Sequence, residues 1–170
     1  MTHGRRKPRK PRLLRDPIEH AMFGAAKLLP CEIKSTLSGA LECEARLREG
    51  VATEDQHTVV YTMLHVARGI EDTGVVRGLR EHIDTALRAM EAVRDRAMAS
   101  GQWRPEPMAF EEMDAVREAL QLNEFQLQHI SAGELKAVAL KLVARATSGG
   151  GSAVRRTAQS LGLPAYSKGQ

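Results

Sequence analysis

Apolar side chains recur at spacings of three and four residues along most of the chain, the period of one face of an α-helix. The clearest stretch runs from Val76 to Ala97, where apolar positions follow one another at this spacing over three heptads. The pattern predicts about five or six helices, with the approximate ranges 17–29, 31–49, 53–74, 76–97, 113–130 and 135–146.

Residues that begin or end helices lie between these ranges. Pro30 is expected to close the first helix. Thr53 with Gln56, and Ser131 with Glu134, have the spacing of a capping box, in which each side chain bonds the other residue's backbone N–H. Three helices are followed by a glycine that can serve as a stop, namely Gly50, Gly74 and Gly101.

The heptad spacing predicts self-association of the chain as a homodimer through its apolar faces. Asn123 occupies a position where the heptad phase calls for an apolar residue. Such an asparagine can fix register by pairing with its copy in a partner, or the helix is slightly rotated and Asn123 lies at the edge of the core. We favour the second interpretation. The expected interface residues are Val76, Leu79, Ile83, Met90 and Asn123.

Composition agrees with a helical fold. The 170 residues include three Phe, two Tyr and one Trp, so Leu, Ala, Val and Met must fill the interior, which suits helix packing. No run of about 18 apolar residues occurs, and we expect no contact with a membrane. The sequence predicts an all-α protein: an antiparallel helical bundle over 17–147, a disordered basic arm over 1–16, and a glycine-rich linker with a flexible tail over 148–170.

Charge is distributed unevenly. Residues 1–16 hold seven cations and one acid, whereas residues 17–147 hold 15 Lys and Arg against 20 acids. A flexible segment with this many cations can neutralise several phosphates without choosing a sequence. An alternative is a solubilising tail that contacts no polymer. The arm is therefore the candidate nucleic-acid-binding element, through Arg5, Arg6, Lys7, Arg9, Lys10, Arg12 and Arg15.

No pattern in the chain indicates catalysis or a cofactor. The six histidines include no pair spaced for a helical zinc site, and no phosphate-binding glycine motif follows a strand. Adjacent carboxylates such as Glu71-Asp72 and Glu111-Glu112 are interpreted as solvated charge. Cys31 and Cys43 lie about 18 Å apart along one predicted helix, too far to form a disulfide. We expect a non-enzyme with no metal or cofactor, located in the cytoplasm, where thiols stay reduced.

The tail contains part of a DNA-binding pattern. Between Val154 and Leu163, Ala158 precedes Gly162 by four residues, as in the close helix approach of a helix-turn-helix. The seven residues that follow cannot complete a recognition helix, so the pattern is only half a motif.

Several segments together resemble a family of small proteins carried by phages and prophages of β-proteobacteria. They are KPRKPR before Asp16, LREGVAT entering the third helix, GQW after the heptad helix, and FQLQHIS before Glu134. The resemblance covers about residues 5–147. Members are mostly uncharacterised and some are labelled Fis-like regulators, but Fis-type proteins keep a full C-terminal helix-turn-helix, which this chain lacks. The resemblance implies a mobile element in a bacterial cytoplasm and transfers no site residue.

Two functions follow as hypotheses. In the first, a non-enzymatic accessory or regulatory protein of a mobile element contacts nucleic acid non-specifically through the arm. In the second, the acidic helical surface binds or inhibits a host protein or docks a phage protein, and the arm is secondary.

Overall fold

The computed structural model describes residues 17–148, and every named element there is a helix. The seven arm cations from Arg5 to Arg15, the linker glycines and the half-motif from Val154 to Leu163 lie outside the described residues. The helices are α1 (Pro17–Ala25), α2 (Pro30–Glu49), α3 (Glu54–Thr73), α4 (Arg80–Ala97), α5 (Phe110–His129) and α6 (Ala132–Ser148).

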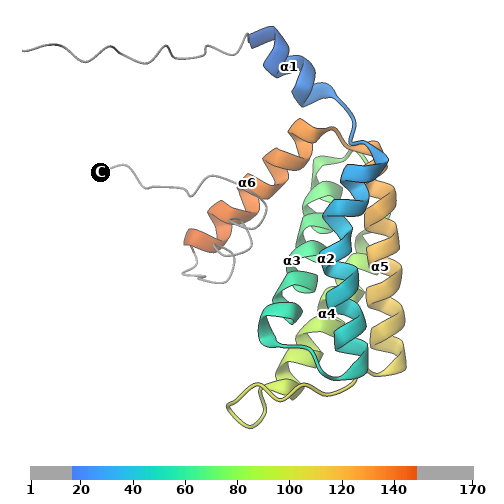
Figure 1. Ribbon diagram of the computed structural model, residues 1–170, viewed down its shortest axis with the longest axis vertical. Helices are drawn as coiled ribbons and strands as arrows, with labels where there is room; N and C mark the ends of the chain where they lie inside the picture. Colours follow the sequence, from blue (N-terminus) through green and yellow to red (C-terminus); the bar gives the residue numbers. More distant parts are fainter. Residues whose placement is uncertain (1–16, 149–170) are drawn as a thin grey trace, which may run out of the picture.

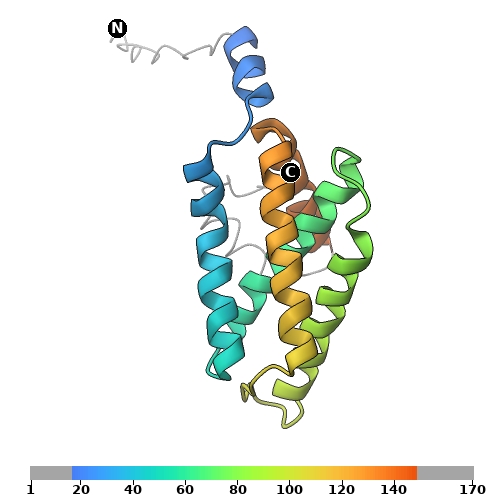
Figure 2. The same ribbon diagram turned by 90° about the vertical axis from the view of Figure 1, so that its right-hand side faces the viewer.

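Helices α2 to α5 form an antiparallel four-helix bundle. Each packs against its neighbour in the chain, α5 closes the bundle against α2, and α3 also contacts α5 (Figure 1). Outside this bundle, α6 packs on α3 and α1 contacts α6, and Figure 2 shows α1 projecting from one end. The predicted all-α antiparallel bundle is confirmed.

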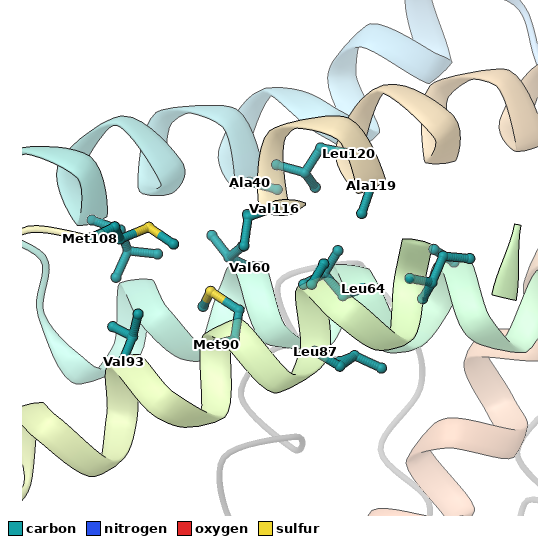
Figure 3. Close-up of a cluster of buried hydrophobic side chains, with 14 of the residues drawn as sticks. Ala40, Val60, Leu64, Leu87, Met90, Val93, Met108, Val116, Ala119 and Leu120 are labelled. Carbon is teal, nitrogen blue, oxygen red and sulfur yellow. The ribbon is translucent and has the colours of Figure 1, made fainter. Parts of the chain in front are cut away.

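The core consists of two clusters of buried side chains. The larger lies among α2 to α5 around fully enclosed residues such as Val60, Leu64, Met90 and Val116 (Figure 3). The smaller includes Ile70, Leu127 and Val138, so it joins α6 to the bundle. Burying one large aliphatic side chain stabilises a fold by about 1.5–3 kcal/mol. The two clusters are therefore the main source of the stability of the bundle.

Most predicted helix ends are confirmed. Gly50 and Gly74 take left-handed φ angles of 71° and 78° and terminate α2 and α3. The Thr53 hydroxyl accepts from the Gln56 N–H at 3.2 Å, completing the first capping box. At Ser131, the backbone N–H donates to Glu134 Oε2 at 2.8 Å, and this second box starts α6.

The first helix differs from its prediction. It ends at Ala25, and Pro30 begins α2 instead of closing α1, because proline lacks an N–H that the first helical turn does not use. Two apolar side chains of this helix are exposed, with Ile18 at 68% and Met22 at 69% of their accessible areas. The backbone at the end of α1 approaches the start of α6, at Gly24 and Ala26.

The fourth helix begins later than predicted. It starts at Arg80, and Val76 is a buried residue of the preceding connection. A carboxylate oxygen of Glu71 accepts the backbone N–H groups of Gly78 and Leu79 at 2.9 and 3.3 Å. Glu71 is itself buried, so its interpretation as solvated charge is wrong: it satisfies backbone donors at the start of α4.

The predicted self-association face lies inside a single chain. Ile83, Met90 and Asn123 are completely buried, Val76 is 9% exposed and Leu79 is half-buried. Helices α3 and α5 cover the apolar stripe of α4 within the same chain. Val76, Ile83, Met90 and Asn123 are therefore part of the core of one chain and are not available to a partner, whereas an interface role for the half-buried Leu79 stays a prediction.

Asn123 is neither at the core edge nor available to a partner. Its side-chain amide donates to the Met63 carbonyl at 3.5 Å, and the Gln126 amide donates to the Ala67 carbonyl at 3.1 Å. Both side chains are fully buried, and Asn123 Oδ1 and Gln126 Oε1 have no hydrogen-bond partner. These two contacts fix the register of α5 against α3 within one chain, because a shift would leave further buried polar atoms unpaired.

Candidate functional site

Charge changes sign where α6 begins. Residues 17–131 contain 12 Lys and Arg against 19 acids, a net charge of −7. Helix α6 carries Lys136, Lys141 and Arg145 against Glu134, and the sequence after Ser148 adds three cations and no acid. The basic C-terminal part of the chain therefore begins with α6, which belongs to the described helices. It does not begin only after the glycine-rich linker that follows α6 in the sequence.

Helix α1 is joined to the start of α6 by backbone contacts. The Ala132 N–H donates to the Ala26 carbonyl at 2.9 Å, and Lys27 forms an isolated β-bridge with Ser131. A Cβ placed on Gly133 would lie 2.7 Å from the Gly24 carbonyl oxygen, so two glycines permit this close approach. The helix that follows the basic arm and the helix that opens the basic C-terminal part are thus held together.

A small hollow lies between α3 and α6. Its volume is about 60 Å³. The apolar side is formed by Gly69, the buried Val138 and the half-buried Leu142. A Cβ on Gly69 would lie 2.6 Å from Val138 Cγ1, so α6 crosses α3 closely at this glycine. The exposed polar side chains that line the hollow are Asp72, Thr73, Lys141 and Arg145.

The polar groups of α3 at the hollow already have partners. Asp72 forms an ion pair with Arg80 of α4, and the Thr73 hydroxyl donates to the Ile70 carbonyl at 2.6 Å. Nearby on α3, burial lowers the pKa of His65, and the positive charges of Arg68 and Arg145 lower it further. The hollow is therefore lined by positive charge from Lys141 and Arg145 of α6 and by the negative charge of Asp72 of α3.

Aromatic and histidine side chains of α3 contact the neighbouring parts of the chain. His57 is buried, and its Nε2–H donates to the Met90 carbonyl at 2.8 Å. Trp103 covers it with an edge contact at 5.5 Å between ring centroids, and its own Nε1–H donates to the Ala52 carbonyl at 2.8 Å. The Tyr61 hydroxyl donates to Glu91 Oε1 at 3.0 Å. These contacts join α3 to α4 and to the α4–α5 connection.

We expect the protein to lose stability as the pH falls below about 6.5. Burial lowers the pKa of both His57 and His65, so in this range the unfolded chain binds protons that the folded chain does not. The contribution is therefore fully present above the ordinary histidine pKa and declines below it. Urea unfolding between about pH 5 and 8 measures this, and His57→Gln, which keeps a donor for Met90, should reduce the pH dependence. If the stability of that variant depends on pH as strongly as before, groups other than His57 cause the pH dependence.

One of the predicted solvated carboxylates forms an interhelical ion pair. Glu112 of α5 binds Arg96 of α4 through two hydrogen bonds of 2.5 and 2.6 Å. These bonds to Arg96, with a smaller contribution from the Ala109 N–H, lower the pKa of Glu112 despite its partial burial. The pair links α4 to α5, and Glu112 is half-buried, so the interpretation of Glu112 as solvated charge is wrong.

Residues 17–148 contain neither a candidate metal site nor a helix that could span a membrane. Within residues 17–148, no group of three or more His, Cys, Asp and Glu side chains is placed to hold a metal ion. Cys31 and Cys43 are both free. Among the described helices, none is long and apolar enough to cross a membrane.

The hollow and its two cations were not predicted from the sequence, although the lack of acids after Glu134 was a visible signal. The predicted arm residues lie outside the described part, and the predicted interface residues are buried except for the half-buried Leu79. Comparison of the chain with models of protein families, with curated proteins and with solved structures finds no match.

Proposed function

We propose that the protein is a non-enzymatic accessory or regulatory protein that contacts nucleic acid non-specifically through the basic arm from Arg5 to Arg15. The separation of charge carries this proposal: seven arm cations precede helices α1 to α5, whose segment has a net charge of −7. An acidic helical surface repels phosphates, so attraction must come from the basic segments at the two ends. The resemblance noted above suggests a mobile element in a bacterial cytoplasm as the setting.

Deleting residues 2–15 is expected to remove salt-sensitive binding of nucleic acid and to leave the helical fold intact. The seven cations release counterions when they contact phosphates, so raising salt from about 50 to 200 mM should weaken the full-length protein by at least about a hundredfold. Fluorescence polarisation with a labelled random duplex and a labelled single strand measures the affinity. Circular dichroism of the deleted chain checks the fold.

Retention of salt-sensitive binding by the deleted chain would contradict the arm as the binding element. Absence of any binding at low salt would contradict nucleic acid as the ligand. That second result would favour a protein-interaction module working through the acidic helices, for which the charge of −7 is the supporting observation.

A further inference from the structure

We propose that the α4–α5 connection, residues 98–109, is a strap that leaves the end of the bundle when the buried His57 gains a proton. The strap lies at the end of the bundle where α2 also passes into α3 (Figure 1). It opens while the helices stay folded. This inference does not depend on nucleic-acid binding and so goes beyond the proposed function.

The strap is held by few contacts. All its residues are described, and Trp103 and Met108 are the two that are not exposed. The Trp103 Nε1–H donates to the carbonyl of Ala52, directly before the N-cap of α3, at 2.8 Å, and the Arg104 N–H donates to the Ala97 carbonyl at 2.8 Å. An irregular segment with so little buried apolar surface opens locally at a lower free energy than a packed helix.

His57 of α3 lies beneath this strap. Its side chain is 3% exposed, and its Nε2 lies 2.8 Å from the Met90 carbonyl of α4. The Trp103 ring covers the imidazole with an edge contact at 5.5 Å, and the Tyr61 ring stacks on it at 6.0 Å, both between ring centroids. Because a carbonyl only accepts, Nε2 carries the hydrogen of the neutral ring, and an added proton binds Nδ1. The added charge is then buried, which is costly.

The charged groups that face His57 come from two helices. Burial lowers the pKa of His57 most, the bond to the Met90 carbonyl raises it, the positive charge of Arg94 on α4 lowers it, and the negative charge of Glu54 on α3 raises it. Burial also raises the pKa of Tyr61, which therefore stays neutral near neutral pH. The closed strap thus holds a histidine that resists protonation.

Opening of the strap is coupled to the proton. When the strap leaves, the imidazole reaches water and its ordinary pKa of about 6.5 returns. The open form therefore binds the proton more tightly, and the ratio of open to closed chains rises about tenfold for each pH unit below 6.5, until the lowered pKa of the closed form is reached. Above that range the strap stays closed. Opening uncovers Ala52 and Met108, which are buried at this end of the bundle.

The test uses the fluorescence of Trp103, the one tryptophan of the full-length protein. Acrylamide quenching measures how accessible its ring is, and circular dichroism measures the helical signal in the same samples. Between about pH 8 and pH 5 the quenching constant should rise severalfold while the helical signal stays constant. A constant that does not change with pH would overturn the proposal, and so would a rise that occurs only together with loss of helix.

Two histidine variants identify the group that takes the proton. His57→Gln keeps a donor for the Met90 carbonyl but cannot be protonated, so quenching of Trp103 should no longer depend on pH. The matched control is His65→Gln, since burial also lowers the pKa of this α3 histidine, which lies about two turns further along the helix. The control should respond to pH as the unaltered protein does. Loss of the response in His65→Gln alone would contradict the role of His57.

Two surface variants test the same coupling without changing the buried ring. Arg94→Gln removes a positive charge and should move the midpoint of the quenching change to higher pH, whereas Glu54→Gln removes a negative charge and should move it to lower pH. Both side chains are exposed, so we expect the fold to be retained. Midpoints that stay the same in both variants, or that move in the reverse directions, would show that His57 does not control the strap.

Discussion

Replacing Ile83 with aspartate is expected to unfold the protein, not to separate folded subunits. Ile83 is completely buried in the larger core cluster, where helices α3 and α5 cover the apolar stripe of α4. An unpaired carboxylate in that cluster has no compensating partner, and such substitutions cost more than about 4 kcal/mol. This is comparable with the whole stability of a small domain, about 5–15 kcal/mol.

Circular dichroism and sedimentation velocity measure the effect of Ile83→Asp. The matched control is Thr85→Asp, which places the same charge two residues away on an exposed position of α4. The control should keep its helical signal and its sedimentation behaviour. The opposite result would be a folded Ile83→Asp chain that sediments as a smaller species than the unaltered protein. It would show that Ile83 lies in a subunit interface and would contradict its place in the core.

The heptads of α4 show what a sequence pattern determines and what it leaves open. The spacing from Leu79 to Ala97 correctly predicts a helix with one apolar stripe. The stripe does not identify its partner, because an antiparallel neighbour in the same chain and a second copy both present a complementary apolar face. Here α3 and α5 are the partners, and this could be known only once the connections had brought them beside α4.

The buried amides have the same explanation. The heptad phase puts Asn123 at an apolar position, and the favoured interpretation, a rotated helix with Asn123 at the core edge, is wrong because the side chain is completely buried. Its partner is the Met63 backbone carbonyl of α3, far away in the sequence. A backbone group offers no sequence signal, so no pattern of residue types could have revealed this contact. The end of α1 was predicted wrongly for a local reason: Pro30 can close one helix or open the next, and it opens α2.

The candidate site combines a part visible in the sequence with one that depends on tertiary structure. The arm from Arg5 to Arg15 is a local run of charge and needs no fold to be noticed. The hollow joins Gly69 and Asp72 of α3 to Lys141 and Arg145 of α6, and nothing local connects these segments. Only the close crossing of Gly69 by Val138 brings them together.

Replacing Gly50 with alanine is expected to lower the free energy of unfolding by about 3 kcal/mol. The residue ends α2 with a φ of +71°, where an L-residue costs roughly 1–2 kcal/mol more than glycine. A Cβ there would also lie 2.6 Å from both the nitrogen and Cδ of Pro107 in the α4–α5 connection. Proline is rigid and its nitrogen is backbone, so the connection itself must move, which adds roughly 1–3 kcal/mol.

Gly101→Ala is the matched control, because it isolates the backbone cost. Its φ of +77° is nearly the same, but a Cβ at Gly101 meets nothing within 4 Å. Urea unfolding should therefore show a loss of about 1 kcal/mol for Gly101→Ala, and the difference between the two variants reports the contact with Pro107. If both variants lose the same free energy of unfolding, the α4–α5 connection moves without an energetic penalty, and Gly50 serves only to end α2. A clear difference would make Gly50 the point where the end of α2 is packed against the connection that leads into α5.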